Sequence, residues 1–181
     1  MYTSDINVKF VEYCRLGDLD NARIAIQDGA DNWLSGLNRA CLEGHQPIVE
    51  LLIPKIELSF NDNNEKFISY MDSGLREACA GGYMSIIQLM IEHKADDWNG
   101  GLCAACWKGH MNVVRFMIEC GAEMWADGLE YACRGGDKDI VLLMLEQGAR
   151  NLNEGLIEAK KWNQPHIEQL LIKLGAVNSN A

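Results

Sequence analysis

Residues 101–122 read GLCAACWKGHMNVVRFMIECGA, and residues 128–149 read GLEYACRGGDKDIVLLMLEQGA. Both stretches have a Gly-Leu pair, a Cys four residues after the Leu, a Gly three residues after the Cys, an apolar run and a closing Gly-Ala. The Gly-Leu pair recurs at Gly36, Gly74, Gly101, Gly128 and Gly155, with offsets of 38, 27, 27 and 27 residues. Self-similarity at a fixed period of this length predicts a repeat protein.

Each repeat predicts two short helices. The first is expected to run from the Gly-Leu pair to two residues past the Cys, where a Gly such as Gly109 breaks it. The second carries apolar residues so densely that it must be buried on most of its surface, and the Gly of the Gly-Ala pair ends it in the left-handed conformation. Neither helix is long enough to be stable alone, so each is expected to pack against its equivalents in neighbouring repeats. The prediction is an all-α solenoid without a β-sheet.

The period divides the chain into six units within one repeat domain, residues 1–181. Counting back 27 residues from Cys41 reaches Cys14, which reveals a degenerate first unit. The expected units are approximately 1–34, 35–72, 73–99, 100–126, 127–153 and 154–181. Residues 61–71 are extra; they have a polar tip, Asn61 to Lys66, followed by an apolar segment, Phe67 to Met71. This insertion is interpreted either as a binding loop that restores a hairpin, or as a tolerated loop whose apolar half packs down.

The consensus L-x-x-A-C-x-x-G-H-x-x-I-V-x-L-L-I-x-x-G-A-D resembles the ankyrin repeat, and the resemblance extends from Phe10 to Ala176. Three features depart from the family pattern. Gly-Leu replaces the T-P-L-H turn, Cys replaces the second Ala, and the period is 27 residues instead of about 33. The missing residues belong to the β-hairpin finger, so the resemblance implies ankyrin-like helix pairs with truncated loops. Short repeats of this kind are similar to those in ankyrin proteins of large DNA viruses and protists.

Charge and cysteine content exclude several classes of function. The net charge of -10 argues against nucleic-acid binding, which needs cations to displace counterions from phosphates, and against adsorption to an anionic membrane. No apolar run approaches the roughly 20 residues of a membrane helix, and Met1 to Phe10 lacks the apolar core of a signal peptide. Seven cysteines are an odd number, and most recur at one repeat position, so all are expected to be free. Free cysteines indicate a reducing compartment, the cytosol or the nucleus, and the predicted location is the cytoplasm, or the host cytoplasm for a viral protein.

One constellation suggests metal or thiol chemistry. Cys103, Cys106 and His110 have the spacing C-x-x-C-x-x-x-H, which supplies three ligands of a zinc site. However, Cys106 and His110 are repeat-consensus residues, Gly109 separates them, and no fourth ligand is evident. The recurring Cys is better explained by packing where helices approach closely. No catalytic residue, metal or cofactor is therefore predicted, and the protein is not expected to be an enzyme.

Large apolar residues also recur three positions before the Gly-Leu pair, at Trp33, Trp98 and Trp125. We interpret them as covers over the seam between repeats, with an exposed aromatic ladder as the alternative. Leu89 lies in the apolar run of a central second helix, so its truncation is expected to be severely destabilising, whereas Asn63 in the insertion tip should tolerate change.

Partner binding is expected at positions that vary between repeats, because the constant positions are occupied by stacking. The resemblance places the residues after each Cys on a concave face. The candidates there and after the Gly-Leu pairs are Arg39, Arg76, Trp107, Lys108, Tyr131, Arg134, Lys161 and Trp162. A basic and aromatic patch suits an acidic, partly apolar protein partner. Such residues also occur as ordinary surface, and Trp162 is also explained as a cover over the last unit. The leading hypothesis is a monomeric protein-interaction module; a Cys103/Cys106 metal or thiol protein and a self-associating subunit are the alternatives.

Overall fold

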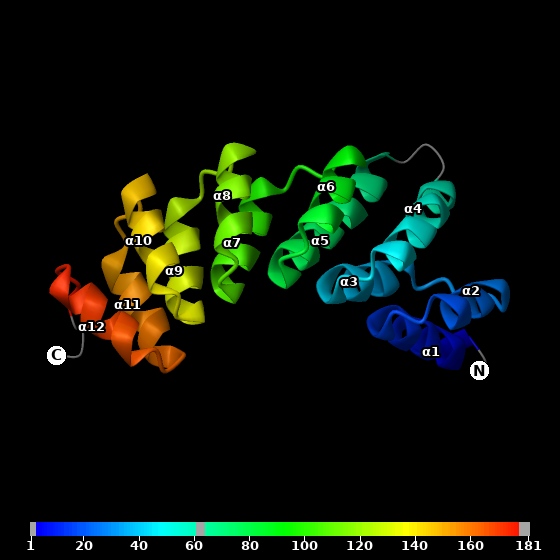
Figure 1. Cartoon of the computed structure of the whole chain (residues 1–181), viewed down its shortest axis with the longest axis horizontal. Coiled ribbons are helices and arrows are strands. Elements are labelled where there is room, and N and C mark those ends of the chain that lie inside the picture. Colours follow the sequence, from blue (N-terminus) through cyan, green and yellow to red (C-terminus); the bar gives the residue numbers. More distant parts are fainter. Residues whose placement is uncertain (1–2, 61–63, 178–181) are drawn as a thin grey trace. The chain divides into compact units, whose positions relative to one another are not determined.

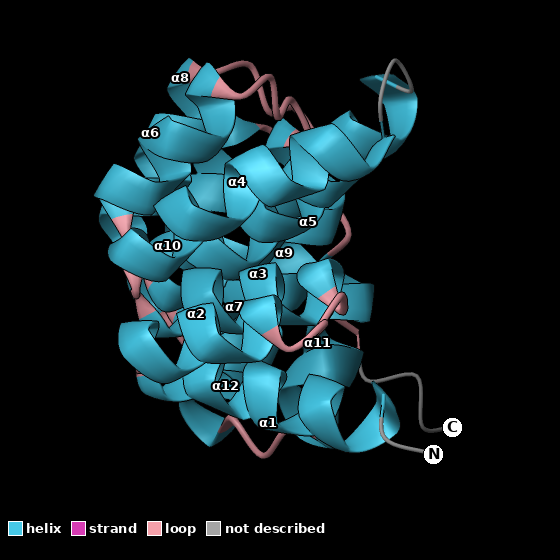
Figure 2. Ribbon diagram, turned by 90° about the vertical axis from the view of Figure 1, so that its right-hand side faces the viewer, coloured by secondary structure: helices cyan, strands magenta, loops and turns pink. Residues whose placement is uncertain are grey.

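A computed structural model describes residues 3–60 and 64–177, and this part of the chain contains twelve helices and no strand (Figures 1 and 2). The helices are α1 (Thr3–Leu16), α2 (Leu19–Gln27), α3 (Trp33–Glu43), α4 (Gln46–Phe60), α5 (Asn64–Gly81), α6 (Met84–Glu92), α7 (Trp98–Lys108), α8 (Met111–Glu119), α9 (Trp125–Gly135), α10 (Lys138–Gln147), α11 (Leu152–Lys161) and α12 (Pro165–Lys173). Consecutive helices form pairs joined by short turns. The predicted all-α, ankyrin-like solenoid class is confirmed.

The chain divides into two compact units, Met1–Asp97 and Trp98–Ala181. Unit 1 contains α1 to α6 and unit 2 contains α7 to α12. In unit 1 the first helices of the pairs, α1, α3 and α5, contact one another in succession, and each packs on its own second helix. Unit 2 repeats this arrangement with α7, α9 and α11 as the first helices. The assignment of the six predicted repeats to one domain remains a prediction.

Glycine ends the first helix of a pair as predicted. Gly136 follows α9 with φ 84°, in the left-handed region that glycine adopts without a steric penalty, and its N–H donates to the carbonyl of Ala132. Gly44 ends α3 in the same way, with φ 82°. In both pairs the second helix then begins within three residues, which accounts for the tight antiparallel turn.

The first helices begin earlier than predicted. Helices α3, α7 and α9 begin at Trp33, Trp98 and Trp125, three residues before the Gly-Leu pair, although they end two residues past the Cys as expected. The extra turn forms because side chains of the preceding repeat hold the loop in front of it. In unit 2, Asn99 Oδ1 accepts hydrogen bonds from the backbone N–H groups of Glu123 and Met124, just before α9.

The core of each unit is built from repeat-constant residues. In the α7–α8 pair, Leu102, Ala105, Cys106, Val113 and Met117 have no exposed surface. In the next pair, Gly128 allows α9 and α10 to approach each other closely, because a Cβ atom at Gly128 would lie 2.7 Å from the sulfur of Met144. Cys106 Sγ lies 3.9 Å from the same sulfur, so this Cys packs in the core as the repeat pattern predicts.

Leu89 is not the main core residue of α6. It is only half-buried, whereas Ile86, Ile87 and Met90 are buried. Successive residues of a helix turn through about 100°, so a continuous apolar run cannot point entirely inward. The predicted importance of Leu89 is therefore too high, and Met90 is the better test of the core.

The described part of the insertion lengthens α5 instead of restoring a hairpin. Residues 61–63 lie outside the described residues, but Asn64 to Met71 form the first part of α5, which has 18 residues, and α4 has 15. The apolar half packs down: Met71 is buried, and Tyr70 contacts Phe60 edge to face with ring centroids 4.9 Å apart. The interpretation as a loop or finger is wrong for the described part, because Met71 and the aromatic residues stabilise a continuous helix.

Candidate functional site

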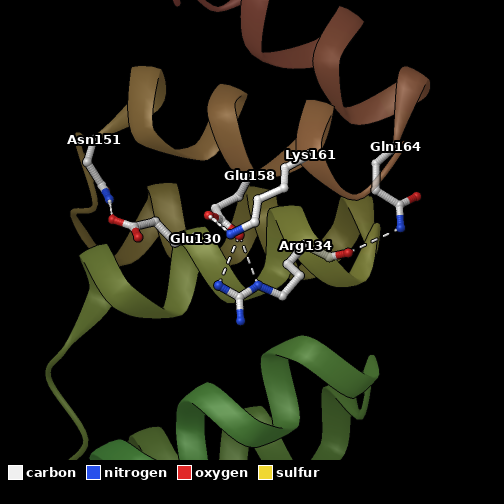
Figure 3. A network of polar contacts seen from close by, with 6 residues as sticks. All are labelled: Glu130, Arg134, Asn151, Glu158, Lys161 and Gln164. Carbon is white, nitrogen blue, oxygen red and sulfur yellow. Dashed lines mark hydrogen bonds and ion pairs between the residues drawn. The ribbon is translucent and has the colours of Figure 1, made fainter.

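Seven side chains gather on the row of first helices in unit 2. We define the Arg134 patch as Trp107, Lys108, Tyr131, Arg134, Glu158, Lys161 and Trp162, which come from α7, α9 and α11 and the residue that follows α11. Trp107, Arg134 and Lys161 are separated by the 27-residue period and so occupy one position in successive pairs. Figure 3 shows Arg134, Glu158 and Lys161 facing one another across α9 and α11.

Arg134 lies at the centre of the patch, surrounded by three aromatic rings. Its guanidinium carbon lies 4.6 Å from the ring centroid of Tyr131, 5.4 Å from that of Trp162 and 5.9 Å from that of Trp107. All three distances are within the range of attraction between a cation and the face of an aromatic ring. Only 22% of the Arg134 side chain is exposed, so this residue organises the patch from within.

Glu158 joins two of the cations. Arg134 Nε donates to Glu158 Oε2 at 3.0 Å, and Nη2 lies 2.9 Å from the same oxygen, while Lys161 Nζ lies 3.4 Å from Oε1 (Figure 3). Burial acts to raise the pKa of Glu158, but the hydrogen bonds and charges of Arg134 and Lys161 outweigh it and hold the pKa below its ordinary value. Glu158 is therefore ionised at neutral pH and neutralises one of the three positive charges of the patch.

The outer surface of the patch is aromatic and cationic. Trp107 and Trp162 meet edge to face, with ring centroids 6.1 Å apart, and are 36% and 44% exposed. Lys108 Nζ lies over the Trp107 ring, 4.3 Å from its centroid. Three cations and one carboxylate leave the patch with a net positive charge, on a chain whose net charge is -10.

The backbone of the fifth repeat, which contains α9 and α10, supports the Arg134 patch. Gly135 follows Arg134, and a Cβ atom there would lie only 2.2 Å from the carbonyl oxygen of Trp107, so only glycine allows this approach of α9 to α7. The side-chain amide of Gln164 donates to the carbonyl of Arg134 at 3.2 Å (Figure 3). Arg134 is thus held through both its backbone and its side chain.

Two of the predicted partner-binding residues lie elsewhere, in unit 1. Arg76 forms an ion pair with Asp97. Arg39 is exposed and lines two adjoining hollows of 300 and 770 Å³ that share Val11 and Ser35; α1 and α3 line both, and Glu77 of α5 also lines the smaller one. The structure therefore brings together six of the eight predicted residues and leaves Arg39 and Arg76 out of the patch.

The comparison with protein families agrees with the helix pairs described above. A family model of ankyrin repeats in three copies matches residues 37–128, which is just over half of the chain. The chain belongs to the ankyrin-repeat family. Ankyrin repeats are generally protein–protein interaction modules, and the family is typically non-catalytic. A comparison with curated proteins gave no significant match.

Sequence reasoning missed two features of these ankyrin repeats. One is Glu158, which lies at a variable position but was not recognised as the carboxylate partner of Arg134. The other is a recurring side chain that holds the loop of the next repeat. Asn7, Asp72 and Asn99 each accept hydrogen bonds from the backbone N–H groups 24 and 25 residues later, and Asn153 accepts one from the N–H group 24 residues later. Asp72, Asn99 and Asn153 are separated by 27 and 54 residues, which are one and two repeat periods. This spacing was the signal in the sequence that could have revealed the recurring side chain.

Metal and thiol chemistry find no support in the described residues. No group of three or more His, Cys, Asp or Glu side chains there is arranged to hold a metal ion. Burial raises the pKa of Cys106, with a smaller contribution from Cys103, and burial raises the pKa of Cys133 to about 12. A reactive cysteine needs a lowered pKa, so these ankyrin cysteines are suited to packing. None of the described helices is long and apolar enough to span a membrane.

Proposed function

We propose that this ankyrin-repeat protein binds a protein partner with an acidic, partly apolar surface, and that the Arg134 patch is the centre of the interface. It acts as a monomer in the cytoplasm, without catalysis and without binding nucleic acid. The proposed surface is the row of first helices, the face that the ankyrin resemblance assigns to the concave side.

The observation that carries the proposal is the gathering of Trp107, Tyr131, Arg134 and Trp162 at one place on the surface. Trp, Tyr and Arg are the residues most enriched among those that dominate binding energy. None of the four is a repeat-constant residue, so stacking does not require them. Their mutual contacts hold the side chains before a partner arrives, which lowers the entropy lost on binding.

Charge supplies the second argument. Lys108, Arg134 and Lys161 outnumber the single carboxylate of the patch, Glu158, on a protein that is acidic overall. A local positive potential attracts an acidic partner and repels other basic proteins. The exposed parts of Trp107 and Trp162 offer apolar surface to the same partner.

The test is affinity capture of the partner from cells of the native host, followed by titration of the purified partner. The double variant Trp107→Ala/Arg134→Ala should weaken binding roughly a thousandfold, because it removes an exposed anchor and the central side chain that holds the three rings, each worth about 2 kcal/mol or more. The control Gln88→Ala/Arg115→Ala changes exposed residues on the second helices α6 and α8 and should leave affinity unchanged. If the control pair weakens binding and the Trp107/Arg134 pair does not, the partner binds the other face and the proposed site is wrong.

A further inference from the structure

The three cations of the Arg134 patch are not equivalent. Arg134 directs two of its nitrogen atoms to Glu158, its guanidinium is surrounded by three rings, and only 22% of its side chain is exposed. Little of this side chain remains for a partner to contact. Lys161 is 62% exposed but shares the carboxylate of Glu158.

Lys108 differs from both. Within the described residues no carboxylate lies within ion-pair distance of its ammonium group, which rests 4.3 Å from the centre of the Trp107 ring. The ring holds the ammonium beside the exposed aromatic surface without neutralising its charge. Among the three cations of the patch, Lys108 is the exposed one that forms no ion pair with a carboxylate of the described residues.

Glu158 has the opposite effect on the patch. Its two carboxylate oxygens occupy Arg134 and Lys161, the positions that a carboxylate of a partner would otherwise take. It also repels any acidic group that approaches the centre. Glu158 thus confines the strongest attraction for an anion to the side of the patch where Lys108 lies.

On the basis of the proposed function, we propose that the partner is an acidic peptide segment with a defined arrangement on the patch. A carboxylate side chain of the partner binds Lys108, and an adjacent apolar or aromatic side chain covers the Trp107–Trp162 pair. Arg134 is a positioning residue that holds the rings, and Glu158 limits affinity and determines which side of the patch the anion occupies.

Selection of dodecamer peptides displayed on phage tests this arrangement without knowledge of the natural partner. Peptides selected on the wild-type protein should carry Asp or Glu beside an aromatic or aliphatic residue. Synthetic copies should bind Lys108→Gln roughly tenfold more weakly, as expected for loss of one charged hydrogen bond. They should bind Glu158→Gln more tightly than wild type, and selection on Lys108→Glu should no longer enrich acidic residues.

Matched variants separate the roles of the residues. Lys138→Gln removes an exposed charge from α10 and should leave peptide affinity unchanged. Arg134→Gln should change the near-ultraviolet circular dichroism of the tryptophans more than Lys108→Gln does, because Arg134 lies near both Trp107 and Trp162, whereas Lys108 lies over Trp107 alone.

The outcomes distinguish the two proposals. If the selected peptides lose affinity for Trp107→Ala but are indifferent to Lys108→Gln and Glu158→Gln, the arrangement proposed for the anion is wrong while the binding surface stands. If the peptides bind Trp107→Ala as well as wild type, or if none is selected, the surface itself is wrong and both proposals fail.

Discussion

Trp107 and Trp162 meet edge to face with ring centroids 6.1 Å apart, although a complete helix pair separates the repeats to which they belong. The intervening repeat has Gly135 at the position equivalent to Lys108 and Trp162. Because glycine has no side chain, α9 can lie close to the carbonyl group of Trp107 at this position. The guanidinium of Arg134 lies near both rings, so a shift of α9 relative to α7 would disturb the patch.

We expect Gly135→Ala to destabilise unit 2 and to separate the two tryptophans. The new Cβ would lie 2.2 Å from the carbonyl oxygen of Trp107, so backbone must move. The steric clash should lower the free energy of unfolding by about 1–3 kcal/mol. This loss exceeds the stabilisation of up to about 1 kcal/mol that replacing a helical glycine with alanine provides. Urea denaturation and near-ultraviolet circular dichroism measure the two effects.

Glu43→Ala is the matched control, because Glu43 is the exposed equivalent of Gly135 in unit 1. Its free energy of unfolding should stay within about 0.5 kcal/mol of wild type. A Gly135→Ala protein as stable as wild type, with an unchanged tryptophan signal, would show that α9 can move away from α7 at no cost.

Met90→Ala should destabilise the protein more than Leu89→Ala. Met90 has no exposed surface and its sulfur faces Gly74, whereas Leu89 is half-buried. Truncation of a fully buried Met costs about 2–5 kcal/mol, and truncation of Leu89 should cost less because part of its surface already contacts water. Equal shifts of the urea midpoint would contradict this orientation of α6; Gln88→Ala, on the exposed side, provides the neutral reference.

Asn99→Ala should lower stability by about 1–2 kcal/mol. The side-chain oxygen of Asn99 accepts hydrogen bonds from the N–H groups of Glu123 and Met124, which precede α9 and lose this partner in the variant. Asn112→Ala changes an exposed asparagine of α8 and should be nearly neutral. Asp72 makes the equivalent bonds in unit 1, so Asp72→Asn, which keeps the acceptor, should be tolerated better than Asp72→Ala.

The period of the sequence predicted which residues would meet, but not how they bond. Residues one period apart occupy equivalent positions on adjacent helices, so the proximity of Trp107, Arg134 and Lys161 could be predicted. The pairing of Arg134 with Glu158 could not, since the distance between two variable positions depends on the angle between α9 and α11 and on side-chain rotamers. Trp162 was predicted as a partner-binding residue, with a cover over the last repeat as the alternative, but its edge-to-face contact with Trp107 could not be predicted from the period. The Asn-rich tip of the insertion resembles a turn, which favoured a loop, whereas the burial of Met71 and the contact of Tyr70 with Phe60 stabilise the helix that begins at Asn64.

The seven cysteines should all be free, and they should react at two very different rates. Cys103 and Cys120 are half-buried, and the other five are buried in the repeat core. Burial raises the pKa of Cys14 and of Cys133 to about 12 each, so at pH 8 these thiols are protonated as well as inaccessible. The thiolate is the nucleophile toward a disulfide reagent, and buried cysteines should therefore react only when the structure opens.

Titration of the unreduced protein with a chromogenic disulfide reagent measures both properties. In the native state two thiols should react first, and in denaturant the total should be seven. Cys120→Ser should remove one fast thiol and leave the slow phase unchanged. A total of five in denaturant would reveal a disulfide, and a fast phase that contains more than the half-buried pair would show that the Cys positions do not form the core between repeats.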